Sequence, residues 1–149
     1  MSTNIVLIGA GEVGFNLSRF LSKENYDLTV IDIDPLKCSR IKNTIDARVI
    51  EGDGCSQRIL QKIDFTNVDF FLSLTRIDEV NLVASIIAKK LGAKNIITRL
   101  RNTEYIHTNA IVTPYEFGID HIIYPEKSAQ IEIENLVRQT SAVEIKGFK

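Results

Sequence analysis

The chain has 149 residues, of which 44% are hydrophobic and 25% are charged, and its 18 Lys and Arg against 19 Asp and Glu give a formal net charge of -1. Such a chain is typical of one globular domain, which at this length buries roughly 70% of its unfolded surface. The low net charge argues against a general nucleic-acid-binding protein, and no apolar run approaches the roughly 20 residues that cross a bilayer. The N-terminus lacks the regions of a signal peptide, so we expect a cytoplasmic protein in which Cys38 and Cys55 stay reduced.

Short apolar runs alternate with helix-like segments along the chain. The first run, 5–8, is continuous rather than alternating, which is typical of a parallel strand buried on both faces. Further strands are expected at 28–31, 49–50, 70–74, 96–100 and 122–124. Helices are expected at 13–21, from Pro35 onward, at 56–62, at 80–91 and near 104–110. This order predicts βαβ crossovers, and therefore an α/β, Rossmann-like, doubly wound, six-stranded parallel sheet with helices on both faces.

The helix that is expected to end at Gly92 carries an apolar stripe. The stripe consists of Val80, Val83, Ala84, Ile87 and Leu91. Two interpretations are open: the stripe belongs to the core of the domain, or it forms a contact with a second subunit.

Residues 1–125 are expected to form the Rossmann-like domain, and 126–149 a crossover helix and the start of a connection to a further domain. The pattern predicts a helix at 129–138 and the beginning of a strand at 142–145. The sequence shows no partner for that strand, so we expect the chain to be a fragment of a longer protein. A natural gene that ends at Lys149 would contradict this expectation.

A glycine-rich motif follows the first strand and opens the first helix. It consists of Gly9, Ala10, Gly11, Glu12, Val13 and Gly14 and matches GxGxxG. The first glycine permits a tight turn, the second lets a phosphate approach the backbone, and the third lets the helix pack against the strand. The helix N-terminus then offers free N–H groups and a partial positive charge to a pyrophosphate. A Walker A loop is excluded, because Phe15 and Asn16 stand where Lys and Ser or Thr are required.

An acidic residue, Asp32, ends the second strand 23 residues after Gly9. A carboxylate at this place accepts hydrogen bonds from the hydroxyls of an adenosine ribose and repels a 2′-phosphate, so NADP should be disfavoured. We include the adjacent Ile33 in the candidate site.

The carboxyl ends of the later strands supply further candidates. Asp53 and Gly54 follow the third strand and are expected near the adenine, and Thr75 lies at the end of the fourth strand. Arg99 and Arg101 close the fifth strand and are candidate phosphate partners. All of these positions belong to the edge where open parallel sheets bind ligands.

Catalysis has little support in the sequence. A dehydrogenase needs a second region for its substrate and a general acid or base near the nicotinamide. His107 and His121 have no metal-ligand or acid partner at a suitable spacing, and Tyr124 and Lys127 do not form a Tyr-x-x-x-Lys pair. We therefore expect a nucleotide-binding module rather than an enzyme.

Several motifs together resemble a known family. These are Ile-Val-Leu-Ile-Gly-Ala-Gly-Glu-Val-Gly at 5–14, Val-Ile-Asp-Ile-Asp-Pro at 30–35, Gly-Asp-Gly at 52–54, Leu-Thr-Arg-Ile-Asp-Glu-Val-Asn-Leu at 74–82, Thr-Arg-Leu-Arg-Asn at 98–102 and Ile-Asp-His-Ile-Ile-Tyr-Pro-Glu at 119–126. The combination is similar to the N-terminal RCK domain, also called KTN or TrkA-N, and most of all to the regulatory subunits of bacterial Trk-type potassium uptake systems. The Gly-loop is common among Rossmann proteins, whereas the segments at 74–82 and 119–126 are far more specific.

The resemblance implies a regulator without catalytic turnover. Members assemble as dimers and then as rings beneath a membrane potassium-transporting subunit, and they change shape when NAD(H), ATP, ADP or AMP binds. The implied ligand residues are Gly9, Gly11 and Gly14 at the phosphates, Asp32 at the ribose, Asp53 and Gly54 near the adenine, Thr75 at the strand edge and Arg99 at a phosphate or a subunit contact. Some relatives that prefer ATP have an arginine where this chain has Glu12, so the resemblance favours NAD or NADH here.

Two other functions stay open on the sequence alone. The chain would also suit the cofactor-binding half of an NAD-dependent oxidoreductase, if a downstream region carried catalytic residues. It would also suit an RCK domain fused to a potassium channel or antiporter, if the same gene encoded transmembrane helices.

Overall fold

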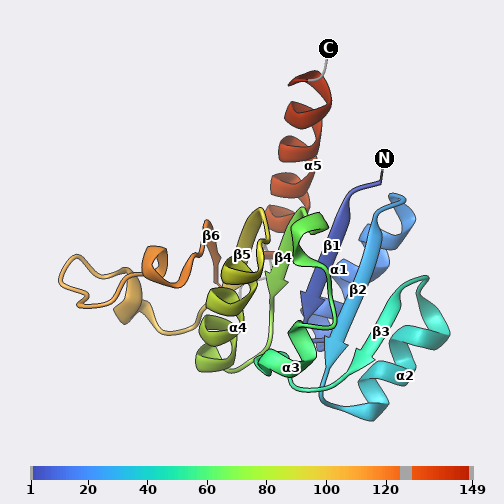
Figure 1. Ribbon diagram of the computed structural model, residues 1–149, viewed down its shortest axis with the longest axis horizontal. Coiled ribbons are helices and arrows are strands. Elements are labelled where there is room, and N and C mark those ends of the chain that lie inside the picture. The colour runs from blue at the N-terminus through green and yellow to red at the C-terminus, as the bar shows by residue number, and fades with distance from the viewer. Residues whose placement is uncertain (1, 125–128, 148–149) are drawn as a thin grey trace.

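The computed structural model describes residues 2–124 and 129–147, and Figure 1 shows a twisted sheet with helices on both of its faces. The strands are β1 (Asn4–Ile8), β2 (Asp27–Asp32), β3 (Arg48–Glu51), β4 (Phe70–Ser73), β5 (Asn95–Arg99) and β6 (His121–Ile123). The α-helices are α1 (Glu12–Lys23), α2 (Pro35–Thr44), α3 (Gln57–Leu60), α4 (Asp78–Leu91) and α5 (Ala129–Gly147). Three short 3-10 helices lie between them, η1 (Phe65–Asn67), η2 (Thr103–Ile106) and η3 (Pro114–Phe117).

The six strands form one sheet in the order β3-β2-β1-β4-β5-β6, and every neighbouring pair is parallel. The predicted Rossmann-like, doubly wound fold is therefore confirmed. The chain moves outward in one direction from β1 to β3 and in the other from β4 to β6. At the carboxyl ends of β1 and β4 the connections consequently diverge, which is where such sheets leave a crevice for a ligand.

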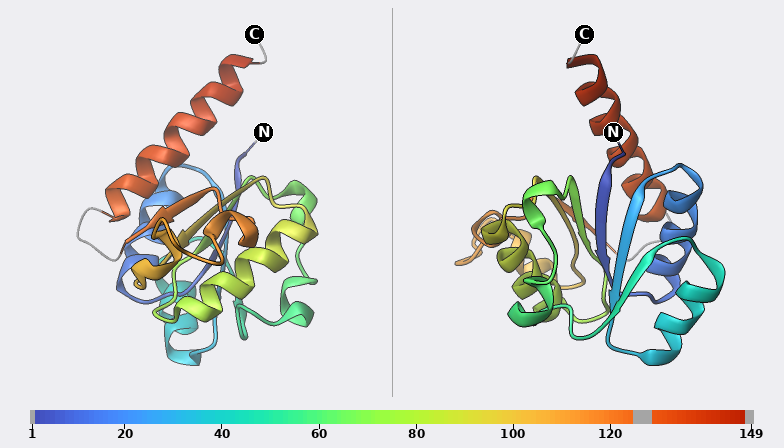
Figure 2. Two further views of the ribbon diagram at one scale, coloured as in Figure 1. Left: turned by 90° about the vertical axis from the view of Figure 1, so that its left-hand side faces the viewer. Right: turned by 45° about the vertical axis from the view of Figure 1, so that its right-hand side comes forward.

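Each buried strand contributes to two cores, which explains the continuous apolar runs. In β1, Ile5 and Leu7 belong to the core formed with α1, α2 and α5, whereas Val6 and Ile8 belong to the core formed with α3 and α4. Figure 2 shows α1 and α2 on one side of the sheet and α4 on the other. Since successive side chains of a strand point to opposite faces, a strand covered on both faces has to be apolar throughout.

The helix ends follow local rules. The Asp34 carboxylate accepts a hydrogen bond from the Leu36 N–H, and Pro35 occupies the first position of α2, where its missing N–H costs nothing. Gly92 ends α4 with a φ of 114°, a left-handed conformation that glycine adopts without strain. The predicted stop at Gly92 is therefore confirmed.

The buried face of α4 agrees with the predicted stripe except at Val83, because Val80, Ile87 and Leu91 are partly buried and pack against the core formed with α3 and α4. Val83 is 43% exposed, whereas Leu82, Ala84, Ser85 and Ala88 face the sheet. Ala84 was correctly placed on the buried side. Val83 therefore lies on the outer side of the helix.

The predicted helix near 104–110 is wrong. The structure has the 3-10 helix η2 there, followed by an irregular loop and then η3. The Asn102 side chain caps η2 by accepting from the Glu104 N–H, and His107 at its end has an extended backbone. Because the His107 ring then accepts from the Asn109 N–H, local side-chain hydrogen bonds replace helical ones.

The predicted strand at 142–145 is also wrong, because α5 continues to Gly147. A strand needs a neighbour for its backbone groups, whereas a helix satisfies them internally. The first part of α5 is held by Ile133 and Val137, both 0% exposed, and by Arg138, which pairs with Glu24. The proposed domain boundary after Pro125 lies outside the described residues.

No helix in the described ranges combines the length and the apolarity that crossing a membrane requires. Within the same ranges, His, Cys, Asp and Glu side chains form no group of three or more that would suit a metal ion.

Candidate functional site

The Gly-loop connects β1 to α1 at the carboxyl edge of the sheet. Gly9 has a φ of 98° and donates its N–H to the Ile31 carbonyl at 3.0 Å, which holds the turn against β2. A Cβ on Gly14 would lie 1.8 Å from the Gly9 carbonyl oxygen, so only glycine allows α1 to approach the turn this closely. A Cβ on Gly11 would meet nothing within 4 Å, which leaves free space above the backbone at the N-cap of α1.

The N-terminus of α1 is open toward this space. Its N-cap residue, Gly11, makes no side-chain cap, and the first intrahelical bond runs from the Phe15 N–H to the Gly11 carbonyl. The preceding N–H groups and the helix dipole therefore suit an anion.

Asp32 is fixed by the loops that it faces. One carboxylate oxygen accepts from the Ala10 N–H at 2.6 Å, and the other accepts from the Asp34 N–H at 2.8 Å. Each oxygen has a second lone pair, so the carboxylate is still able to accept hydrogen bonds from ribose hydroxyls. The bond to Ala10 ties the end of β2 to the Gly-loop.

These elements enclose a cavity of about 460 Å³, which is within the range of small-molecule sites. The predicted residues that line it are Gly9, Gly11, Glu12, Val13, Asp32, Ile33, Asp53, Gly54, Thr75 and Arg99. Ala10 is buried and lines a smaller adjacent hollow of about 190 Å³ together with Gly11 and Glu12, whereas Gly14 lies beneath the turn against β1. The structure thus gathers the predicted residues at one edge, and their roles toward a ligand stay predictions.

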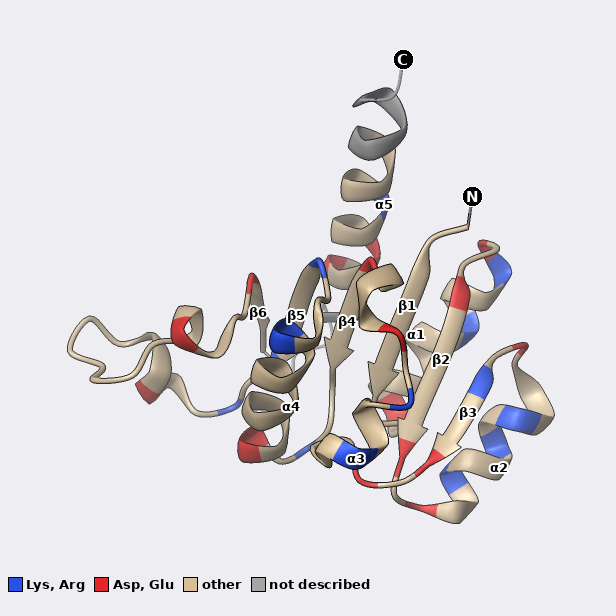
Figure 3. Ribbon diagram, viewed as in Figure 1, with Lys and Arg blue, Asp and Glu red and all other residues tan. Residues whose placement is uncertain are grey.

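Basic side chains surround part of the cavity. They are Lys37, Arg76, Arg99 and Arg101, against the acidic Glu12, Asp32 and Asp53. Figure 3 shows residues of both charges around the carboxyl ends of β2, β3 and β4. Burial lowers the pKa of the Arg99 guanidinium, and the nearby charges of Arg101 and Arg76 lower it further.

The Arg99 side chain also has an unused donor. Its Nη1 lies 3.5 Å from the Leu74 carbonyl, while its Nε is buried without a hydrogen-bond partner among the described residues. A buried donor without a partner costs free energy, whereas the Arg99 side chain as a whole is half-buried and lines the cavity.

Asp53 lies on the opposite side of the cavity and is held by the residue that follows Gly54. Its carboxylate accepts from the Cys55 N–H at 3.0 Å and from the Cys55 thiol at 3.1 Å. These bonds lower the pKa of Asp53, with the backbone bond contributing most. Burial, together with the hydrogen bond and charge of Asp53, raises the pKa of the Cys55 thiol to about 11.

The sequence did not point to Lys37, Arg76 and Ile77 in the cavity wall. Arg76 and Ile77 stand inside the motif at 74–82, directly after Thr75, and that position was the available signal. Lys37 lies in the first turn of α2, where a lysine is usually solvated.

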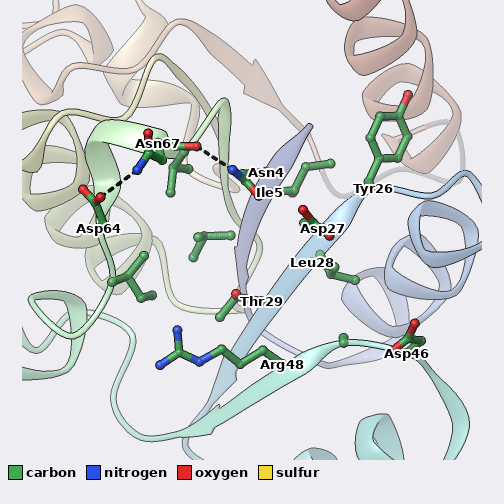
Figure 4. A pocket seen from close by; sticks show the side chains of 14 residues that line it. Asn4, Ile5, Tyr26, Asp27, Leu28, Thr29, Asp46, Arg48, Asp64 and Asn67 are labelled. Atoms are coloured by element: carbon green, nitrogen blue, oxygen red, sulfur yellow. Dashed lines mark hydrogen bonds between the residues drawn. The ribbon is translucent and has the colours of Figure 1, made fainter. Parts of the chain in front are cut away.

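A second hollow, of about 390 Å³, lies at the amino ends of β1, β2 and β3. Figure 4 shows Arg48 extending from β3 toward the side of the hollow on which Asp64 lies, and Asn67 bonded to both Asp64 and Asn4. Asp27 and Asp46 also line this hollow, so its wall has three carboxylates for one arginine. It lies at the edge of the sheet opposite the Gly-loop, and we place the candidate site at the carboxyl edge.

The sheet order, the glycine turn and the acidic end of β2 define this chain as a domain of the Rossmann type. A family model described as the TrkA-N domain matches residues 5–125. The chain belongs to the TrkA-N domain family.

Relatives share most of this chain. It is 36% identical over 144 residues to a Trk system potassium uptake protein TrkA homolog from Archaeoglobus fulgidus, covering 97% of this chain and 32% of the relative. It is 30% identical over 141 residues to a homolog of the same name from Methanothermobacter thermautotrophicus, covering 95% of this chain and 63% of the relative. The chain therefore spans about a third of one relative and less than two thirds of the other.

Solved structures share the fold. The TrkA-N domain of an inner membrane protein from Escherichia coli superposes with a TM-score of 0.71 at 16% identity, covering 91% of this chain and 97% of that one. The GsuK channel bound to NAD superposes with a TM-score of 0.68 at 13% identity, covering 84% of this chain and 22% of the channel chain.

Proposed function

We propose that this chain is a nucleotide-binding regulatory domain of a Trk-type potassium uptake system. The observation that carries the proposal is the cavity that is lined by the open N-terminus of α1, by Asp32 and by the half-buried Arg99. These three features suit the phosphates and the ribose of an adenine nucleotide.

In this proposal each part of the cavity wall contacts one part of the nucleotide. Ile33, which is 69% exposed at the rim, packs against the adenine together with the loop at Asp53 and Gly54. The Asp32 carboxylate accepts hydrogen bonds from the ribose hydroxyls. The free space at Gly11 receives a phosphate, and Arg99 neutralises its charge.

The preferred ligand is NAD or NADH, with ATP, ADP and AMP as the alternatives. Glu12 lies in the first turn of α1 and lines the cavity, so its carboxylate repels an additional terminal phosphate. Two solved structures of similar fold are the GsuK channel bound to NAD and GsuK bound to ADP, so both ligand classes are known on this architecture.

The regulatory role follows from linkage. A nucleotide shifts an equilibrium between two arrangements of subunits only by its difference in affinity for them. Ile77, the N-cap residue of α4 at the cavity rim, is 56% exposed, and Val83 on the outer side of α4 is 43% exposed; we propose that these two residues contact a second subunit. The partner in this proposal is a membrane potassium-transporting subunit. The domain forms homo-oligomers, and full-length proteins form a ring at the cytoplasmic face of the membrane. The proposed role involves no catalytic turnover.

Thermal unfolding of the purified chain with NADH, NAD, ATP, ADP and NADPH, with and without magnesium, tests the proposal. At a ligand concentration of about 100 times its dissociation constant, the stabilisation is about 2.7 kcal/mol. At roughly 2–4 °C per kcal/mol, this corresponds to about 5–11 °C. Shifts with NAD(H) or adenine nucleotides but a smaller shift with NADPH are expected, and no shift with any of them would contradict the proposal.

A further inference from the structure

We propose that Asn81 is a positioning residue for the candidate site: it holds Thr75 and Arg99 in place and links the occupancy of the cavity to helix α4. This inference rests on the proposed nucleotide site and goes beyond it, because Asn81 itself does not line the cavity.

Asn81 is 0% exposed and all of its side-chain polar atoms are engaged. Its Oδ1 accepts from the Thr75 N–H at 3.0 Å, from the Thr75 hydroxyl at 2.7 Å and from the Ser73 hydroxyl at 3.0 Å. Its Nδ2 donates to the Thr75 carbonyl at 3.0 Å and to the Arg99 carbonyl at 2.8 Å. One amide thus binds the ends of two neighbouring strands.

The Asn81 bonds lie at the point where the pairing between β4 and β5 ends. The register between β4 and β5 ends at the pair of Ser73 and Thr98. Thr75 and Arg99 lie beyond that pair, where the two strands diverge toward the cavity. Arg99 is still paired with Ile123 of β6, but between the ends of β4 and β5 the Asn81 amide takes the place of direct strand pairing.

Arg99 depends on this connection for its orientation. Its side chain has one long contact, from Nη1 to the Leu74 carbonyl, and a buried Nε without a partner in the described ranges. The direction of the guanidinium therefore depends on the backbone of Arg99, which pairs with Ile123 of β6 and whose carbonyl accepts a hydrogen bond from Asn81. An anion that pulls on the guanidinium consequently acts on α4 through Asn81.

Ser85 offers a matched control on the same helix. It is also 0% exposed, and its hydroxyl bonds the Thr98 hydroxyl at 2.6 Å and the Asn81 carbonyl at 2.7 Å. Replacing it removes a buried polar link between α4 and β5 within the ladder. The strand ends at the cavity keep their bonds to Asn81.

The test is isothermal titration of ADP and of adenosine into the wild type and into Asn81→Ala, Ser85→Ala, Arg99→Ala and the Asn81→Ala/Arg99→Ala double variant. Adenosine reports on the half of the site formed by Asp32 and Ile33, whereas ADP also reports on the phosphate half. Asn81→Ala should weaken the binding of ADP by about tenfold or more, and should change the affinity for adenosine by less than about twofold. Ser85→Ala should leave both affinities within about twofold of the wild type, although it lowers stability.

The double variant shows whether Asn81 acts through Arg99. If it does, Asn81→Ala has little further effect on ADP once Arg99 is alanine. Equal losses for ADP and adenosine, additive effects in the double variant, or the same ADP loss in Ser85→Ala would overturn the inference.

Asn81→Ser, which keeps a hydroxyl at this position, replaces Asn81→Ala if the alanine variant does not fold, with the same expected ratio of losses. If the wild type binds none of ADP, adenosine and NADH, the proposed function fails. If it binds ADP and adenosine and Asn81→Ala binds them equally well, the positioning role fails alone.

Discussion

Two glycines of the same motif should respond differently to the same substitution. In Gly14→Ala the new Cβ would lie 1.8 Å from the Gly9 carbonyl oxygen. An ordinary C···O contact is about 3.3 Å, so α1 has to retreat by about 1.5 Å from a turn made of backbone. In Gly11→Ala the new Cβ meets nothing within 4 Å.

The magnitudes follow from this geometry. Overpacking against backbone costs about 3 kcal/mol, the upper part of the usual range, and the better helix propensity of alanine returns about 1 kcal/mol. Gly14→Ala should therefore lose about 2 kcal/mol of unfolding free energy, or about 4–8 °C in Tm. Gly11→Ala should stay within about 0.5 kcal/mol of the wild type, because the small penalty at an N-cap and the smaller entropy of the unfolded chain oppose each other.

Urea denaturation of both variants measures these differences, and titration with NADH separates stability from binding. Gly11→Ala should fold normally and lose at least about tenfold in NADH affinity, because its methyl group occupies the space above the loop. A Gly14→Ala variant as stable as the wild type would contradict the expected clash with the turn. A Gly11→Ala variant with unchanged NADH affinity would contradict a phosphate site above Gly11.

Three further predictions concern Asp32, Asp78 and Cys55. Asp32→Asn should weaken the binding of NADH by about tenfold and reduce the discrimination against NADPH, because the charge that repels a 2′-phosphate is removed. An equal ratio of NADH affinity to NADPH affinity in wild type and variant would contradict this. The Asp78 carboxylate accepts hydrogen bonds from the N–H groups of Arg101 and Asn102 at 2.8–3.1 Å. Asp78→Ala should therefore lower the free energy of unfolding by about 1–2 kcal/mol and speed amide exchange at those two residues. Exchange rates equal to the wild type would exclude this role. Because the pKa of the Cys55 thiol is raised to about 11, its alkylation should accelerate as the pH approaches that value, and Asp53→Asn should bring the acceleration to a lower pH; a rate that levels off near pH 9 in the wild type would argue against the raised pKa. The linked effect on stability has the matching sign: the raised thiol pKa stabilises the folded state below the ordinary value of 9.0, and this contribution is lost as the pH rises toward 11.

The fold was predictable because its strongest signals are local. A continuous run such as 5–8 has to be covered on both faces, and the glycine turn followed by an acidic strand end is specific to one topology. Gly92 and Pro35 marked helix ends for reasons that need only backbone geometry. The segments that were predicted wrongly, 104–110 and 142–145, depend instead on local side-chain hydrogen bonds and on whether a partner strand exists.

The candidate site was predictable where a residue follows a strand directly, and less so elsewhere. Asp32 and Arg99 are fixed to the carboxyl edge by the strands they end, whereas Lys37 reaches the cavity from α2. The role of Asn81 requires the ends of β4 and β5 to be adjacent, which no spacing in the sequence expresses. Val83 was misplaced because the hydrophobicity of a side chain alone does not show which side of α4 faces away from the core.

The most direct test of the central claim is an NMR titration of the isotopically labelled chain with NADH, following the backbone amides and the Arg99 side-chain Nε–H. We expect saturable shifts at Gly9, Gly11, Asp32 and Arg99, and none of comparable size around Arg48 in the second hollow. Saturable shifts confined to Arg48 and its neighbours, or no saturable shift at all, would contradict a nucleotide site at the Gly-loop.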